Sequence, residues 1–297
     1  MLNLVLIKGG IGMPQSNAND LINDGIFYIC PAVDENKVLD KISQTEVKLW
    51  NKNRGTNQKW KLIYNSNKRA YKIQVMDGTN LFLTWDAPLP SVSVKSNTNN
   101  DDQYWSLLQD YTTSDTIIRS YKNPNLVLQY NINNALEVST QTNNNNQFFK
   151  FLNCIYNDFN NKTCRISTVL DNTKFLSKVL DGPNVVIWTW FDSSRQKWKF
   201  VYNEKRGAYK LFNSENNWFL TAPPSTNPNV VVYNGGDYDD QYWIINYSDN
   251  NVNQYTFTNL SAKGKILGVY NNQTSNNTNV QVFANGGSNQ KWTIAVL

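Results

Sequence analysis

Histidine is absent from this chain of 297 residues. Because histidine is the usual general base of enzymes, a common metal ligand and the side chain that titrates near neutral pH, its absence removes all three roles together. Catalysis by a Ser–His or Cys–His pair is excluded. The sequence therefore indicates a binding or structural protein rather than an enzyme, and we expect it to carry no metal or other cofactor.

Cysteine is almost as scarce. The three cysteines are Cys30, Cys154 and Cys164, and no two of them form a Cys-x-x-Cys pair. An odd number at these spacings argues against a zinc site and against a dense disulfide framework. Two arrangements stay open for the second and third cysteines: a Cys154–Cys164 bridge, or buried and reduced thiols.

Charge and long apolar runs are limited as well. Charged residues make up 17% of the chain, and the net charge of +5 includes no Lys/Arg block that could follow a phosphate backbone, which argues against nucleic acid as a partner. The apolar run from Leu2 to Ile7 is too short for a membrane span or for the core of a signal peptide, so we expect no membrane insertion. We expect residues 1–13 to form an extension outside the fold.

Aromatic residues, in contrast, are abundant and recur at regular intervals. The pattern Gln-x-aromatic occurs six times, and it ends at Trp60, Trp105, Phe149, Trp198, Trp243 and Trp292. A longer period lies on top of this one, because "DDQYW" at 101–105 recurs at 239–243. The chain is therefore a duplicated unit, and each unit contains three copies of a smaller repeat.

Within each copy, short runs such as "WKLIY" and "YKIQV" have the alternation of strands, and helical periodicity is nearly absent. Three such copies, closed around a pseudo-threefold axis, describe a β-trefoil. We predict an all-β chain of two tandem β-trefoil domains, over residues 14–152 and 165–297, joined by a linker at 153–164. The repeated tryptophans should fill the centre of each trefoil, the glutamine amides should pair with loop backbone groups, and the paired aspartates of "DDQYW" should be turn residues.

Gln-x-Trp copies in two tandem trefoils resemble the ricin B-chain type of lectin. Phrases such as "YKNPNLVLQYN" and "WFDSSRQKW" are also similar to the haemagglutinin components that accompany botulinum neurotoxin. The resemblance implies a secreted lectin, here without a recognisable signal peptide, that binds galactose- or sialic-acid-terminated glycans as one subunit of a toxin complex with other haemagglutinin subunits. We expect the sugar sites in the second domain and a scaffold or docking role for the first.

The resemblance places one candidate sugar site in the last copy. Phe283 supplies the stacking face, and the other candidates there are Tyr270, Gln273, Asn289 and Gln290. Gly268 stands where the family has an aspartate that accepts hydrogen bonds from two sugar hydroxyls. Because a charge-assisted hydrogen bond contributes about 1.5–3 kcal/mol, this departure weighs against the site.

A second candidate lies in the fourth copy. Trp188 occupies the aromatic position there, and Arg195 replaces the asparagine that precedes the glutamine. The planar fork of an arginine suits a carboxylate-bearing sugar such as sialic acid. The alternative is that Trp188 or Trp190 belongs to the core, since alternation puts both on one side of a strand.

The first copy has every residue type of a site, namely Asp40, Trp50, Asn57 and Gln58. Only ten residues separate Asp40 from Trp50, against fifteen between Gly268 and Phe283, so the loop that would form the lip of the pocket is shorter. We interpret this set as structural, and its members as weak candidates.

The remaining copies depart further from the family pattern. The fifth offers Tyr233 and Asp240 but has no early aspartate. The second and third have Lys95 and Ser139 at the aromatic position, which indicates vestigial sites.

Three rival functions fit the sequence less closely. The first is a carbohydrate-binding module with the same fold that binds polysaccharides rather than cell-surface glycans. An assembly subunit whose sugar sites have decayed is favoured by Gly268. A glycosidase would need two carboxylates about 5–10 Å apart in one cleft, and six similar copies offer no unique cleft.

Overall fold

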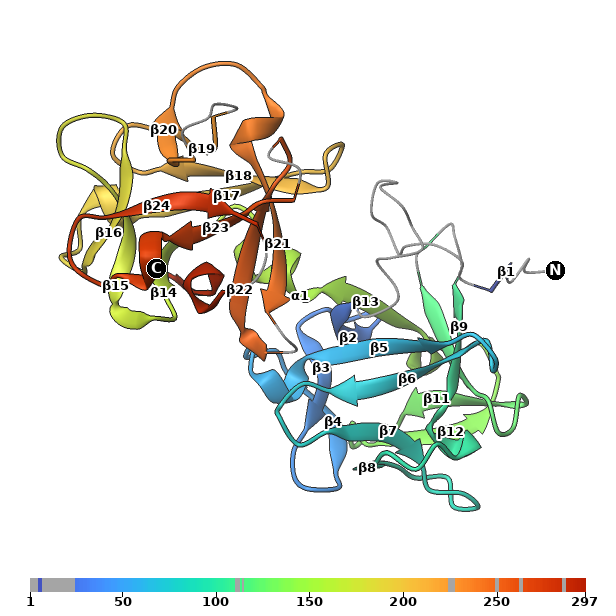
Figure 1. Ribbon diagram of the computed structural model, residues 1–297. Helices are drawn as coiled ribbons and strands as arrows, with labels where there is room; N and C mark the ends of the chain where they lie inside the picture. Colours follow the sequence, from blue (N-terminus) through green and yellow to red (C-terminus); the bar gives the residue numbers. More distant parts are fainter. Residues whose placement is uncertain are drawn as a thin grey trace. The chain divides into compact units, whose positions relative to one another are not determined.

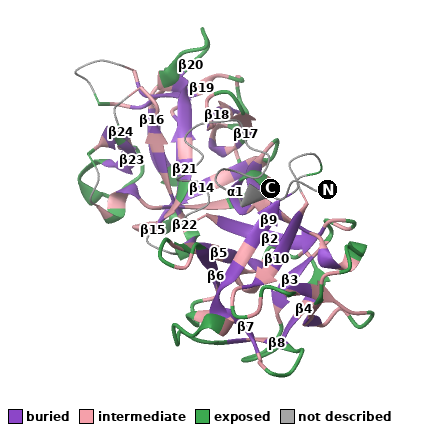
Figure 2. Cartoon of the chain, turned by 90° about the vertical axis from the view of Figure 1, so that its right-hand side faces the viewer, coloured by how far each residue is buried: buried purple, intermediate pink, exposed green. Residues whose placement is uncertain are grey.

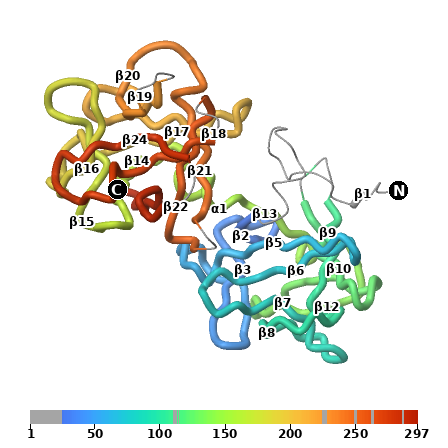
Figure 3. Tube along the Cα trace, viewed as in Figure 1, coloured from blue at the N-terminus to red at the C-terminus, as the bar shows by residue number. Residues whose placement is uncertain are grey.

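The computed structural model describes residues 5–6, 25–109, 113, 115–223, 228–248, 251–261, 264–284 and 287–297. The chain divides into two compact units, Met1–Cys154 and Ile155–Leu297. Figure 3 shows that each unit is made from one continuous half of the chain. The division falls within the segment predicted as a linker, where α1 (Cys154–Phe159) is the one α-helix of the described residues.

Strands dominate the first unit (Figure 1). They are β1 (Val5–Leu6), β2 (Ile26–Pro31), β3 (Lys37–Lys41), β4 (Val47–Asn51), β5 (Trp60–Asn65), β6 (Ala70–Val75), β7 (Leu81–Trp85), β8 (Val92–Ser96), β9 (Trp105–Gln109), β10 (Thr116–Ser120), β11 (Leu126–Tyr130), β12 (Leu136–Thr140) and β13 (Phe149–Asn153). The pairs β2–β5, β5–β6, β6–β9, β9–β10, β10–β13 and β13–β2 close a barrel. The hairpins β3–β4, β7–β8 and β11–β12 complete the unit.

The second unit repeats this plan. Its strands are β14 (Thr163–Thr168), β15 (Asp171–Lys178), β16 (Val185–Thr189), β17 (Trp198–Asn203), β18 (Ala208–Asn213), β19 (Phe219–Thr221), β20 (Val231–Tyr233), β21 (Tyr242–Ser248), β22 (Asn251–Asn259), β23 (Ile266–Val269), β24 (Thr278–Phe283) and β25 (Trp292–Val296). The pairs β14–β17, β17–β18, β18–β21, β21–β22, β22–β25 and β25–β14 close the barrel. The hairpins are β15–β16, β19–β20 and β23–β24.

A closed barrel with three hairpins is a β-trefoil, so the predicted fold of two tandem trefoils is confirmed. Closure pairs the barrel strands on both sides and leaves them no open edge. In Figure 2 the barrel strands are largely buried, and the turns between strands are exposed.

The aromatic residues of the repeat lie at the centre of the two cores. All six, Trp60, Trp105, Phe149, Trp198, Trp243 and Trp292, are 0% exposed. Each tryptophan also donates its indole N–H to a leucine carbonyl of its own copy, over 2.8 to 3.0 Å. The indole ring fills the core, and its hydrogen bond also joins the hairpin to the core. Burying an N–H without a partner would cost free energy of folding, so this bond is needed. The structural interpretation of these aromatics is confirmed.

The glutamine of each motif precedes its aromatic residue by two positions, at the end of a short 3₁₀ turn. In the first copy this turn is η1 (Thr56–Gln58). The Gln58 side chain accepts a hydrogen bond from the backbone N–H of Asn53 at 2.8 Å and donates to the carbonyl of Asn51 at 2.9 Å. Gln196 in the fourth copy makes the equivalent bonds to Phe191 and Thr189. The glutamines thus hold the loop before each motif, as predicted.

The three cysteines are reduced. Cys30, Cys154 and Cys164 are all buried, and no disulfide joins them, which decides between the two arrangements left open by the sequence. Burial raises the pKa of the Cys30 thiol to about 12.

The predicted extension, residues 1–13, contributes one short strand to the first unit. Val5 and Leu6 pair with β9, and the other residues of the extension lie outside the described part.

Candidate functional site

A recurring contact allows the six copies to be compared residue by residue. The indole of Trp60 donates to the carbonyl of Leu39, and the next residue is Asp40. We call the residue after this leucine the floor position. It is occupied in chain order by Asp40, Thr84, Gln129, Ser177, Thr221 and Gly268, with the third copy placed by its strand register.

Strand register defines a second shared position. In the first copy Trp50 pairs with Val38, two residues before the floor, so its ring and the floor side chain lie on one face of the hairpin. We call this the aromatic position. It is occupied by Trp50, Lys95, Ser139, Trp188, Tyr233 and Phe283. The prediction that Lys95 and Ser139 take the place of the ring in the second and third copies is confirmed.

The rings at the aromatic position face solvent. Trp50 is 56% exposed, Tyr233 52% and Trp188 38%, whereas Phe283 is partly buried. The alternative that Trp188 is a core residue is therefore wrong. Trp190 instead packs against Phe175, with ring centroids 5.0 Å apart, and Arg165 lies over both rings.

The first copy brings together the set predicted from the sequence. Asn57 donates from Nδ2 to Oδ1 of Asp40 at 2.5 Å, and Gln58 donates from Nε2 to Oδ2 at 2.7 Å. Asp40 is 2% exposed, and this burial raises the pKa of its carboxyl, although the two hydrogen bonds act in the opposite direction. Each oxygen thus accepts one side-chain hydrogen bond from the motif, and a carboxylate oxygen can accept a second bond from a ligand hydroxyl.

The first and last copies differ in the length of one turn but not in strand register. Both copies have the same register, with Val38 opposite Trp50 and Ile266 opposite Phe283. The five extra residues of the last copy lie in the turn between β23 and β24, beyond the floor position. The first copy therefore has the shorter turn that the sequence predicts, while its floor and aromatic positions match those of the last copy.

The last copy is closed at the floor. A Cβ built on Gly268 would lie 3.0 Å from Cδ2 of Phe283, 3.0 Å from Cγ of Gln290 and 3.2 Å from the carbonyl of Asn289. The ring therefore occupies the space that an aspartate would need. Asn289 donates from Nδ2 to the carbonyl of Val269 at 2.8 Å, which ties the motif to its hairpin.

Tyr270 and Gln273 lie in the long turn of the last copy, in and just after η6 (Tyr270–Asn272), and both are exposed. The same turn is fastened to the hairpin of the fourth copy. Asn276 accepts hydrogen bonds from the backbone and hydroxyl of Thr189, each at 2.9 Å, and from Lys174 at 2.8 Å. The turn thus connects the last copy to the strand end that carries Trp188.

The fourth copy carries charged residues in and around its motif turn, whose Gln196 donates a hydrogen bond to the carbonyl of Trp188 at 3.3 Å. Arg195 follows Ser194 in η4 (Ser194–Gln196), and its guanidinium lies 5.1 Å from the ring centroid of Phe191. Glu215 is 3.9 Å from Nε of Arg195 and 3.0 Å from the ammonium of Lys178. Two cations thus share one carboxylate, which leaves a positive charge for an anionic group.

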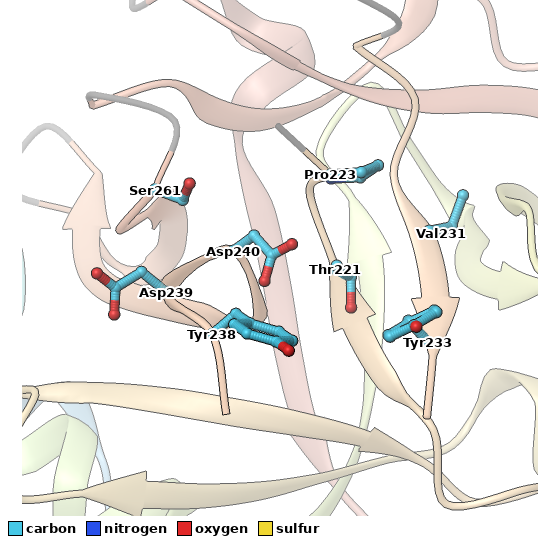
Figure 4. A pocket seen from close by; sticks show the side chains of 8 residues that line it. All are labelled: Thr221, Pro223, Val231, Tyr233, Tyr238, Asp239, Asp240 and Ser261. Atoms are coloured by element: carbon cyan, nitrogen blue, oxygen red, sulfur yellow. The ribbon is translucent and has the colours of Figure 1, made fainter. Parts of the chain in front are cut away.

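The fifth copy contains a pocket of about 410 Å³, which the sequence did not predict. Tyr233 and Tyr238, which are 52% and 62% exposed, form its rings. In Figure 4 the Asp240 carboxylate points toward Thr221, in the floor position, whereas Asp239 points away. Oδ1 of Asp240 is buried and has no hydrogen-bond partner among the described residues, and burial raises the pKa of this carboxyl.

The described residues include no cluster of three or more His, Cys, Asp or Glu side chains that could hold a metal ion. Within the same residues, no helix has the length and apolar character needed to span a membrane.

Comparisons with known proteins agree with this geometry. Residues 194–283 match the family model described as "ricin-type beta-trefoil lectin domain-like". The chain is 55% identical over 286 residues to the main hemagglutinin component type C of Clostridium botulinum C phage and equally to the type D component of Clostridium botulinum D phage, covering 96% of this chain and 100% of each relative. A solved mosquitocidal holotoxin is 25% identical, with 94% of this chain and 35% of that chain covered and a TM-score of 0.46.

Proposed function

The chain belongs to the family of the main haemagglutinin components, carbohydrate-binding haemagglutinins with ricin-type lectin domains, and from this premise we propose that it binds galactose- or sialic-acid-terminated glycans of cell surfaces. Binding would be its whole activity, without catalysis. The proposal extends the family assignment to particular sugars and particular residues.

The observation that carries the proposal is the recurrence of an exposed ring at one strand position. Trp50, Trp188 and Tyr233 are exposed, although the strand residue directly before each of them is buried. Tryptophan and tyrosine rings are enriched at binding surfaces, because they combine an apolar face with a polar group. A pyranose has one face of C–H groups that packs on such a ring, while its hydroxyls reach polar groups at the floor and beside the motif glutamine.

We assign the sialylated glycan to the fourth copy. Trp188 would stack on a sugar ring, and Arg195, which shares Glu215 with Lys178, would pair with the sugar carboxylate. For a neutral galactosyl end, Phe283 with Asn289 and Gln290 in the last copy and Trp50 with Asp40 and Asn57 in the first are the candidate sites. Of these, only the first copy has an acceptor at the floor.

The proposal is tested with a glycan array and haemagglutination. The wild-type chain should bind sialylated and galactosyl glycans and agglutinate erythrocytes, and lactose or sialyllactose should inhibit agglutination. An array without galactosyl or sialyl ligands would refute the proposal. Binding confined to plant or bacterial polysaccharides would instead support the polysaccharide-binding module.

We also propose that the chain works as a secreted subunit of a toxin-associated complex. Its relatives are named as components, and several weak sites held in one assembly gain avidity. The closed floor at Gly268 favours a variant of this function, in which the last copy serves assembly only. Co-purification of the chain with other haemagglutinin subunits would support the complex, and recovery as a lone chain from a reconstituted mixture would contradict it.

A further inference from the structure

The two "DDQYW" sequences provide an internal comparison at the pocket of the fifth copy. Asp102 and Asp240 occupy the same position, directly before the motif glutamines Gln103 and Gln241. Asp101–Gln103 and Asp239–Gln241 both form 3₁₀ turns, η2 and η5. The turn prediction for these aspartates is therefore correct, but it is incomplete, because the two second aspartates meet different surroundings.

In the second copy the carboxylate faces an ammonium of the protein itself. The Nζ atom of Lys122 lies 3.9 Å from Oδ2 of Asp102 and 5.9 Å from the ring centroid of Trp85. A cation therefore occupies this place, between a carboxylate and an aromatic face.

Among the described residues of the fifth copy, smaller side chains stand at the two matching positions. Strand register pairs Trp105 with Ser120 and Trp243 with Asn259, so Ser261 is the counterpart of Lys122. The counterpart of Trp85 is Ala222, one residue after the floor. Two large side chains are thus replaced by two small ones, although Oδ1 is buried and lacks a hydrogen-bond partner among the described residues in both Asp102 and Asp240. The pocket of about 410 Å³ lies there.

In the fifth copy the aromatic wall is formed by Tyr233 and Tyr238 instead of a counterpart of Trp85. Gly235 and Gly236, between these two tyrosines, let the rings lie close to the backbone. A Cβ on Gly235 would lie 3.0 Å from Cε1 of Tyr233. A Cβ on Gly236, which has a φ of +68°, would overlap the ring of Tyr238. Any other residue would therefore displace a ring, and the loop "YNGGDYDDQYW" is suited to form an aromatic wall.

The pocket offers acceptors rather than donors at its floor. Thr221 donates its hydroxyl to the carbonyl of Phe219 at 2.9 Å, so its oxygen can only accept from a ligand. The nearby cations are already paired, since Arg206 contacts Asp237 and Asp239, and Lys210 lies 3.1 Å from Asp237. The ligand group that fits is a cationic donor.

We infer that the fifth copy binds an amino sugar, a hexosamine whose protonated, non-acetylated amine pairs with Asp240 while its ring packs on Tyr233 and Tyr238. The ammonium would take the place that Lys122 holds in the second copy. This inference rests on the proposed function in one respect, because it assigns a sugar ring to the aromatic position of this copy.

The test is a calorimetric or NMR titration of the full chain with glucosamine, N-acetylglucosamine and glucose. Glucosamine should bind at least ten-fold more tightly than the other two sugars, and binding should weaken with salt because it depends on a charge pair. Asp240→Asn should lower glucosamine affinity at least ten-fold. Ser261→Lys should abolish it by supplying the ammonium from the protein. Asp102→Asn, the matched change in the second copy, should leave it unchanged.

Each alternative has its own signature. Equal affinity for the three sugars, or unchanged glucosamine binding by Asp240→Asn, would overturn the inference. Tighter binding of Nα-acetyl-lysine amide than of glucosamine would also overturn it, in favour of a peptide ligand. Binding of sialyllactose and lactose is measured on the same samples. If the chain binds these sugars but not glucosamine, only the amino-sugar inference is refuted. If it binds glucosamine but neither sialyllactose nor lactose, only the galactosyl and sialyl assignment is refuted. Thermal unfolding identifies variants that fail to fold.

Discussion

Removing the ring of Trp188 should weaken sialoglycan binding without unfolding the protein. The residue is 38% exposed. For a side chain of about 250 Å², that corresponds to roughly 95 Å² of surface. At about 25 cal/mol per Å², complete covering by a sugar contributes about 2.4 kcal/mol, and covering of half contributes about 1.2 kcal/mol. Trp188→Ala should therefore lower sialyllactose affinity between about eight-fold and about 60-fold.

The assay is a titration of wild type and variant with sialyllactose, followed by thermal unfolding of both. Lys95→Ala is the matched control, because Lys95 has the same strand position in a copy without a ring. The control should bind sialyllactose like the wild type. Affinity within two-fold of wild type for Trp188→Ala would refute the fourth-copy site. A large fall in unfolding temperature would refute the conclusion that this ring lies outside the core.

Three further outcomes are expected. Arg195→Gln should lower sialyllactose affinity at least ten-fold and leave lactose affinity unchanged, because a charge-assisted pair is lost, and an equal loss for both ligands would contradict the assignment. Gly268→Ala should destabilise the chain by about 1–3 kcal/mol in urea unfolding, because the added methyl overpacks against Phe283 and Gln290, and a stabilised variant would show that the floor is not closed. The thiol of Cys30, with its pKa raised to about 12, should not react with a disulfide reagent at pH 8 in the native state, whereas the unfolded chain should titrate three thiols, and fewer than three would indicate a disulfide.

The fold could be predicted because each copy of the repeat contains both the buried side chains and the backbone groups that pair with them. A buried Trp198 needs a partner for its N–H, and the carbonyl of Leu176 provides it at 3.0 Å. Gln196 needs loop backbone groups and finds them at Phe191 and Thr189. Because such requirements are local to each copy, their spacing is sufficient to identify the trefoil.

The candidate sites were less predictable, because their quality depends on contacts across a copy. The residue types in the first copy were recognised, but the sequence did not indicate that Asn57 and Gln58 use both oxygens of Asp40. The closed floor at Gly268 depends on how Phe283 leans across the hairpin. The exposure of Trp188 depends on where β16 ends, which period-two alternation does not specify.

The fifth copy was underestimated because the family pattern looks for an aspartate at the floor. There the floor is Thr221, and the carboxylate comes instead from Asp240, beside the motif glutamine. Comparison with the second copy supplies the missing signal, since the same five letters are followed by Lys122 in one copy and by Ser261 at the matching position of the other. Because the Gln-x-Trp motif fixes the backbone in both, such replacements change the chemistry of a site at little cost to the fold. Six copies of one fold can therefore present different ligand groups, and each copy has to be tested with its own ligand.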